Sequence, residues 1–348
     1  MLASRRERTL GMLAVGFVAL SATLAAVGAA ATASVRFGVA VIAVILLARV
    51  VSQAARALSA KLGAVAGALL TAGFGNCVEL IVTLESLLHN LTTVAKASIV
   101  GGVLANALFT LGMAMVVGGV RKPLQTFDRR RAGVTGAMLF LAVSGLVLPS
   151  VAGAMRGARY TQGLSLCVAI TFVCVYGLGI LYAGAVGRKQ RRQTDVTARG
   201  MLPIVATLAF ATALVAVASD DLVSVVMPLA AAWRVAPAFV GLVLLPLVGV
   251  APELFAALSF AARDQMDASV EMAVGSSLQI ALFIAPALVL VGALAGKAFA
   301  FDFTPVEMAG LVMAAVLTSL VAADGETHWY EGVLVLAAYA IFGAVYLL

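Results

Sequence analysis

The sequence predicts an all-α, polytopic transmembrane bundle, and three observations support this fold class. First, 63% of the residues are hydrophobic and 11% are charged, whereas a soluble domain is about half apolar and one quarter charged. Second, apolar runs long enough to cross a bilayer recur from residue 11 to the C-terminus. Third, the connections between these runs are short.

The apolar runs divide the chain into about eleven candidate spans. They lie near residues 11–31, 36–60, 63–88, 94–118, 132–153, 160–186, 200–232, 236–262, 267–295, 302–322 and 328–348. We expect four parts: a basic segment with one extra helix (1–35), a first five-helix repeat (36–186), a basic linker (187–200) and a second five-helix repeat (201–348).

The first run raises the question of a signal peptide. Three arginines precede it, and AAATAS (29–34) loosely resembles a signal-peptidase site. Because the run of about twenty residues is long for a signal peptide, we expect it to be retained as a span.

The net charge of +7 comes from basic residues that cluster in short loops. With the N-terminus inside, sixteen of the 23 lysines and arginines lie on the cytoplasmic side, six lie outside, and Arg49 lies within a span. This bias predicts a cytoplasmic N-terminus and an external C-terminus, and it favours membrane orientation over nucleic-acid binding. The high alanine content fits a bacterial plasma membrane.

Cysteines and histidines do not form a metal-binding pattern. The three cysteines lie inside apolar runs without a CxxC spacing, so we interpret them as small buried residues. His89 and His328 are 239 positions apart, near span ends, where a surface or capping role is expected.

An internal repeat is the most informative feature. GNCVEL (75–80) and GVAPEL (249–254) each place a glutamate, Glu79 or Glu253, four residues after a glycine. Another glycine follows each glutamate after 22 residues, and these glycines open GGVLAN (101–106) and GSSLQI (275–280). Because the acidic spans are the third and the eighth, an odd offset of five, the two copies enter the membrane from opposite sides, as in inverted-repeat transporters.

The two glutamates predict cation and proton chemistry. A carboxylate at mid-bilayer costs several kcal/mol unless it lines a cavity or is paired. If the repeat brings the two together, both cannot stay ionised alone, but a divalent cation or protons would neutralise them. Pro252 has no N–H for the Val248 carbonyl, which would then be a further oxygen ligand beside Glu253.

The neighbouring polar residues complete an all-oxygen set, which suits a hard cation such as Ca²⁺. It comprises Asn76, Asn106, Gln279, Ser276 and Ser277. Interhelical hydrogen bonding is the alternative for each of them taken singly. Glu85 lies nearer a span end, where a solvated position is expected, with an access-path role as the alternative. Asp220 follows a long apolar run and is a second candidate for that path.

Three stretches resemble the calcium/proton exchanger family of the calcium/cation antiporter superfamily. They are GNCVELI (75–81), GSSLQIALFIAP (275–286) and ADGETHWYEGVLVLAAY (323–339). The resemblance implies ten core helices in two inverted repeats, often with one extra helix. It implies Glu79 and Glu253 as the central cation- and proton-binding carboxylates.

The same resemblance implies oxygen ligands from the partnering helices and a lined pocket. Asn106 and Gln279 would be the ligands, with Asn76 and Ser276 lining the pocket. The chain departs from the family's second signature, Gly-Asn-Ala-Ala-Glu-His, through Val250, Pro252 and Leu254. These replacements remove polar groups from one repeat.

The sequence therefore predicts a secondary active cation/proton antiporter that exchanges Ca²⁺ for protons by alternating access, with protons, cation and membrane lipid as its partners and no cofactor. A Na⁺- or K⁺-linked exchanger of the same superfamily is the first alternative. A membrane-embedded enzyme using the carboxylates as acid and base is the second. Against it, neither histidine is near a glutamate of the repeat and no nucleophile–histidine pairing or phosphate loop is evident.

Overall fold

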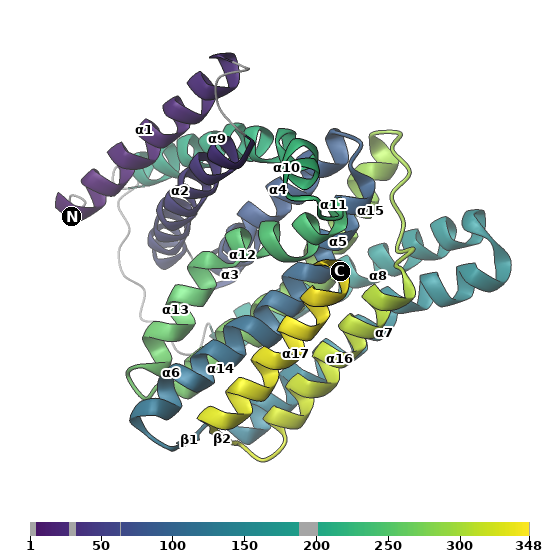
Figure 1. Ribbon diagram of the computed structural model, residues 1–348. Helices are drawn as coiled ribbons and strands as arrows, with labels where there is room; N and C mark the ends of the chain where they lie inside the picture. The colour runs from purple at the N-terminus through teal and green to yellow at the C-terminus, as the bar shows by residue number, and fades with distance from the viewer. Residues whose placement is uncertain (1–4, 28–32, 63, 188–200, 348) are drawn as a thin grey trace. The chain divides into compact units, whose positions relative to one another are not determined.

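The computed structural model describes residues 5–27, 33–62, 64–187 and 201–347, and these are almost entirely helical (Figure 1). The predicted all-α class is confirmed. By contacts, the chain forms two compact units, each of which takes segments from both sequence halves. Unit 1 comprises 1–89 and 176–234, and unit 2 comprises 90–175 and 235–348. The predicted linker (187–200) lies almost wholly outside the described residues, and the division into two sequence repeats stays a prediction.

Unit 1 is built around the long helix α2. Its helices are α1 (Arg5–Val27), α2 (Ala33–Lys61), α3 (Ala64–Gly75), α4 (Cys77–Leu88), α9 (Leu202–Ser224) and α10 (Val226–Trp233). Helix α2 packs along α1 and α9, and α4 packs against α9. The buried side of α2 includes Ala40, Val44, Leu47 and Val51, whose spacing of three and four residues places them on one helix face.

Unit 2 contains the remaining helices and one two-stranded ribbon. They are α5 (Thr92–Leu104), η2 (Ala105–Thr110), α6 (Leu111–Arg121), β1 (Leu124–Thr126), α7 (Arg129–Arg156), α8 (Ala158–Gly187, whose last residues belong to unit 1), α11 (Pro237–Phe239), η4 (Val240–Leu244), α12 (Leu245–Gly249), α13 (Ala251–Ala261), α14 (Met266–Gln279), η5 (Ile280–Ile284), α15 (Ala285–Leu294), α16 (Pro305–Ala322), β2 (Glu326–His328) and α17 (Trp329–Leu347). The three η segments are π-helical turns that continue their neighbouring α-helices.

Most of each predicted span is helical where the structure describes it, but the spans predicted near 63–88, 200–232 and 236–262 are each interrupted by a turn, at Asn76, Val225 and Val250. Eight helices among the described residues are long and apolar enough to cross a membrane, or nine if one bent pair counts as a single span. The count of eleven is not confirmed. The AAATAS stretch falls mostly on undescribed residues, so retention of the first span also stays a prediction.

Two helices of unit 2 begin at side-chain caps. Asp128 accepts hydrogen bonds from the backbone N–H groups of Arg130 and Arg131, both at 3.0 Å, and so starts α7. Thr304 and Glu307 form a reciprocal capping box that starts α16. These caps fix where each helix enters the bundle.

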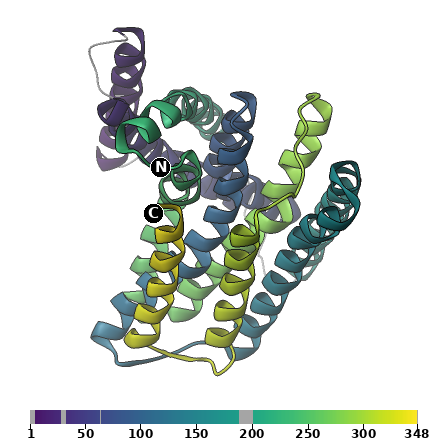
Figure 2. The same ribbon diagram turned by 45° about the vertical axis from the view of Figure 1, so that its right-hand side comes forward.

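Contacts between loops of unit 2 agree with the predicted alternation of spans. Strands β1 and β2 pair antiparallel, with Leu124 opposite His328, and so join the loop after α6 to the loop before α17 (Figures 1 and 2). Lys122 pairs with Asp264 at 2.9 Å. The predicted order of spans places both partners of each contact on one side of the membrane. Which side is cytoplasmic stays a prediction.

The structure corrects one prediction about the cysteines and confirms one about the histidines. Cys77 is buried, but Cys167 and Cys174 on α8 are exposed. An apolar helix whose outward face meets lipid needs no protein cover there, so an apolar run does not imply burial. His89 is the exposed C-cap residue of α4, and His328 is exposed at the end of β2.

Candidate cation-binding site

Both repeat glutamates lie directly after a break between two helices. In unit 1, α3 ends at Gly75, Asn76 is the N-cap, and Glu79 is the third residue of α4. In unit 2, α12 ends at Gly249, Val250 is the N-cap, and Glu253 is the third residue of α13. The second pair of helix segments is bent by 56° at the break.

The break in unit 2 has a local cause. Pro252 is the second residue of α13, a position where a missing N–H costs nothing because first-turn donors have no intrahelical partner. The Val250 N–H still donates to the Pro246 carbonyl at 2.8 Å, and the Leu254 N–H donates to the Val250 carbonyl at 2.9 Å. The proline predicted to disturb a continuous helix therefore begins a new one.

A helix N-terminus is a favourable place for a buried carboxylate. Glu79 and Glu253 are each only 7% exposed. The N–H groups of a first turn and the helix dipole stabilise an anion there by about 0.3–2 kcal/mol. This offsets part of the burial cost of the charged form, and the remainder favours binding a cation or a proton.

Unit 2 brings four of the predicted site residues onto three mutually packed segments. Glu253 is on α13, Asn106 is on η2, and α13, α14 and η2 all pack against one another. Ser276 is buried and Gln279 is half-buried, both on α14. The Asn106 side chain is fully buried, and neither its oxygen nor its nitrogen has a hydrogen-bond partner among the described residues. A buried amide without a partner is costly, which fits a group that waits for a ligand.

Unit 1 supplies the other two predicted residues. Asn76 is buried and lies three positions before Glu79, across the first turn of α4. The Thr83 hydroxyl donates to the Glu79 carbonyl at 2.6 Å, and the Ser86 hydroxyl donates to the Val82 carbonyl at 2.9 Å. The buried hydroxyls of α4 are thus used within the helix, and the Glu79 carboxylate and the Asn76 amide are its candidate cation ligands.

The π-helical turns are a feature that the sequence did not reveal. Asn106 lies inside η2, and Gln279 immediately precedes η5. The two π-helical turns therefore begin at nearly the same place relative to GGVLAN (101–106) and GSSLQI (275–280). Such turns often occur at functional sites, because they shift side chains relative to a regular α-helix. No residue pattern in either segment distinguishes a π turn from an α turn.

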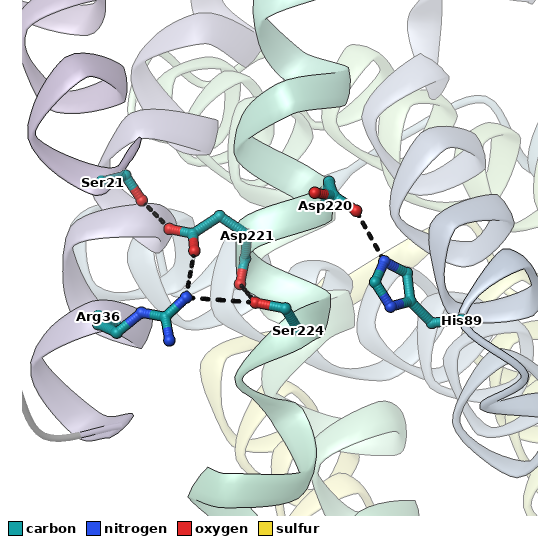
Figure 3. Close-up of polar contacts among 6 residues, drawn as sticks. All are labelled: Ser21, Arg36, His89, Asp220, Asp221 and Ser224. Atoms are coloured by element: carbon teal, nitrogen blue, oxygen red, sulfur yellow. Dashed lines mark hydrogen bonds and ion pairs between the residues drawn. The ribbon is translucent and has the colours of Figure 1, made fainter. Parts of the chain in front are cut away.

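The three candidate access-path residues have different surroundings. The single O–H of Ser277 is shared between the carbonyl oxygens of Val103 and Ala273, each 3.2 Å away, and the contact with Val103 links α14 to α5. Glu85 and Asp220 lie together with His89, and their ligand atoms are all within 4.8 Å of one another. His89 Nε2 is 2.7 Å from Asp220 Oδ1 (Figure 3). An access-path role for these residues stays a prediction.

Sequence reasoning missed the role of Asp221, the neighbour of Asp220. Asp221 is buried and accepts a hydrogen bond from Ser21 on α1 and, at 2.7 Å, an ion pair from Arg36 on α2. Figure 3 shows Asp220 and Asp221 on opposite sides of α9, facing different neighbours. The SDD sequence held the signal, since adjacent helical residues cannot face the same partner.

A helical membrane bundle with a buried carboxylate after a helix break in each half defines the class of ion-coupled membrane transporters. The model of the family described as sodium/calcium exchanger protein matches residues 32–184 and 203–348. The chain belongs to this family.

Two curated relatives and one solved structure are similar to this chain over most of its length. The Ca(2+)/H(+) antiporter of Aphanothece halophytica is 33% identical over 330 residues, which are 88% of this chain and 88% of that protein. The Ca(2+)/H(+) antiporter ChaA of Bacillus subtilis is 33% identical over 319 residues, 88% of this chain and 90% of that protein. The structure of native YfkE matches with a TM-score of 0.84 and 30% identity, covering 97% of this chain and 99% of that one.

Proposed function

We propose that this protein is a secondary active antiporter that exchanges Ca²⁺ for protons across a membrane. The observation that carries the proposal is the repeated placement of a buried glutamate, Glu79 or Glu253, at the third residue of a helix that follows a break. The relatives that are Ca²⁺/H⁺ antiporters support the same function.

The exchange follows from charge balance. Two ionised carboxylates carry two negative charges, which one Ca²⁺ or two protons neutralise. Leaving both ionised and empty inside the membrane is unfavourable, so the release of one kind of ion favours the binding of the other. This balance predicts two protons per Ca²⁺.

The proposed ligands are all oxygen atoms. Glu79 and Glu253 bind the cation and the protons, Asn106 and Gln279 add amide oxygens, and Asn76 and Ser276 line the pocket. Hard oxygen ligands suit Ca²⁺, which takes six to eight of them. The unpartnered amide of Asn106 is the strongest support among these uncharged residues.

Alternating access is proposed to use the helix breaks. Because one helix ends and another begins at residue 76 and again at residue 250, the two parts of each broken helix can tilt separately. We also propose a cytoplasmic N-terminus, an external C-terminus and a bacterial plasma membrane, which the distribution of basic residues and the composition support.

Everted membrane vesicles provide the test. An imposed pH difference should drive ⁴⁵Ca²⁺ uptake into vesicles that contain the protein, and Glu79→Gln or Glu253→Gln should abolish that uptake. Glu271→Gln is the matched control, because Glu271 is an exposed glutamate on α14. Full uptake by either of the first two variants would refute the proposed roles.

One observation favours a different cation. Val250 places a fully buried apolar side chain at the N-cap position that Asn76 holds in the other repeat. With fewer polar groups in one repeat, a Na⁺- or K⁺-linked exchanger is the second candidate. Adding each cation in turn to the same vesicles and recording which one dissipates the pH difference distinguishes the two.

A further inference from the structure

We propose that Glu85, His89 and Asp220 form a second cation site in unit 1, which binds a divalent transition-metal ion such as Zn²⁺. The site is separate from the proposed Ca²⁺ ligands, and its existence does not depend on the transport function. Three properties of this cluster support the site: its geometry, its uncompensated charge and its mixed nitrogen and oxygen ligands.

The geometry allows all three side chains to reach one ion. Glu85 and His89 are four residues apart along α4, so they lie on the same face one turn apart. Asp220 approaches from α9, which packs against α4 (Figure 3). The three ligand atoms lie within 4.8 Å of one another, and Zn²⁺–ligand distances of about 2.0–2.2 Å require only small side-chain rotations to close that gap.

The charge of the cluster is unbalanced. Two carboxylates share one imidazole, and within the described residues no lysine or arginine forms an ion pair with Glu85 or Asp220. The adjacent Asp221 is different, because Arg36 neutralises it on the other side of α9 (Figure 3). With a neutral imidazole the cluster carries two negative charges, which a divalent cation would compensate.

The ligand types select the class of ion. An imidazole nitrogen together with carboxylates suits zinc, manganese or cobalt, whereas the all-oxygen residues proposed for transport suit Ca²⁺. The site is also accessible: the side chain of Asp220 is 60% exposed and that of His89 is 36% exposed. A bound metal would join α9 to α4, the helix that carries Glu79 six residues before Glu85.

The purified full-length protein in detergent, in calcium-free buffer at neutral pH, tests the proposal by calorimetric titration with Zn²⁺. One equivalent should bind. His89→Ala and Asp220→Asn should each weaken binding by more than about tenfold, since even the loss of a side chain that only orients a metal ligand costs that much. His328→Ala is the matched control. Among the described residues, His328 forms an ion-pair contact with one carboxylate, Glu331 (Nδ1 to Oε1, 3.6 Å), and both residues lie outside the proposed cluster.

Two further measurements keep the test decisive. Zn²⁺ should raise the unfolding temperature of the wild type but not that of His89→Gln, a variant that preserves side-chain bulk if alanine impairs folding. Undiminished Zn²⁺ binding by His89→Gln, or an equal loss in His328→Ala, would overturn the site. Displacement of Zn²⁺ by millimolar Ca²⁺ would overturn the assigned class of ion.

Discussion

Replacing Gly101 with alanine should destabilise unit 2, because α5 meets the η4–α12 segment there with no room for a side chain. A Cβ atom at Gly101 would lie 2.0 Å from the Leu242 carbonyl oxygen and 2.6 Å from Pro246 Cγ. The carbonyl belongs to the backbone, so relief requires the two segments to separate. Ser98 on α5 also donates to the Gly241 carbonyl at 3.1 Å, which holds them together.

The size of this effect follows from two opposing contributions. Overpacking of this kind costs about 1–3 kcal/mol, and a backbone obstacle places the cost toward the upper end. The higher helix propensity of alanine stabilises the folded protein by about 1 kcal/mol relative to glycine, which offsets part of this cost. The net loss of about 1–2 kcal/mol corresponds to a fall of about 2–8 °C in Tm for a unit of this size.

Thermal unfolding in detergent, followed by intrinsic fluorescence, measures this shift. Gly275→Ala is the matched control, because Gly275 holds the equivalent sequence position in the second repeat and a Cβ there meets nothing within 4 Å. Its Tm should be unchanged or slightly raised. A Gly101→Ala protein as stable as the wild type, or equal losses in both variants, would refute the reasoning.

Two other substitutions separate ligand roles from structural ones. Asn106→Leu should leave Tm unchanged or higher, because it removes a buried amide that has no hydrogen-bond partner among the described residues. In ⁴⁵Ca²⁺ uptake it should raise the KM for Ca²⁺ about tenfold or more. A lower Tm with normal uptake would contradict a ligand role. Arg36→Met should cost about 3–5 kcal/mol, because it leaves Asp221 buried and unneutralised. The double variant Arg36→Met/Asp221→Asn should recover most of that stability. If its loss in the free energy of unfolding equals the sum of the losses of the two single variants, the pairing is contradicted.

Much of the fold could be predicted because it depends on long-range composition and spacing. The apolar runs located the helices, and the repeated GxxxE pattern marked Glu79 and Glu253, which both prove to be the third residue of a helix that follows a break. The break before Glu253 was partly visible through Pro252. The matching break at Asn76 was indicated less directly: Gly73 and Gly75 predicted a loosened helix there, but no proline marks the position and glycines are frequent in membrane helices.

What the sequence could not show depends on contacts between distant segments. Arg36 stands at the start of an apolar run with no acidic residue near it in the sequence, and only the packing of α2 on α9 pairs it with Asp221. His89 was correctly assigned to a helix end, but its neighbour Asp220 is 131 residues away. Gly101 and Gly275 looked equivalent, yet one lies against a backbone carbonyl and the other faces open space.

Proton release on Ca²⁺ binding measures the alternating neutralisation of the two buried glutamates most directly. Purified protein in weakly buffered detergent solution with a pH indicator should release protons when Ca²⁺ is added, approaching two per bound ion at a pH where both carboxyls start protonated. Glu79→Gln and Glu253→Gln should each lower the number of protons released per bound Ca²⁺ by the contribution of one carboxyl group. Ca²⁺ binding without proton release between pH 5 and 8, or release unaltered in both variants, would contradict the account.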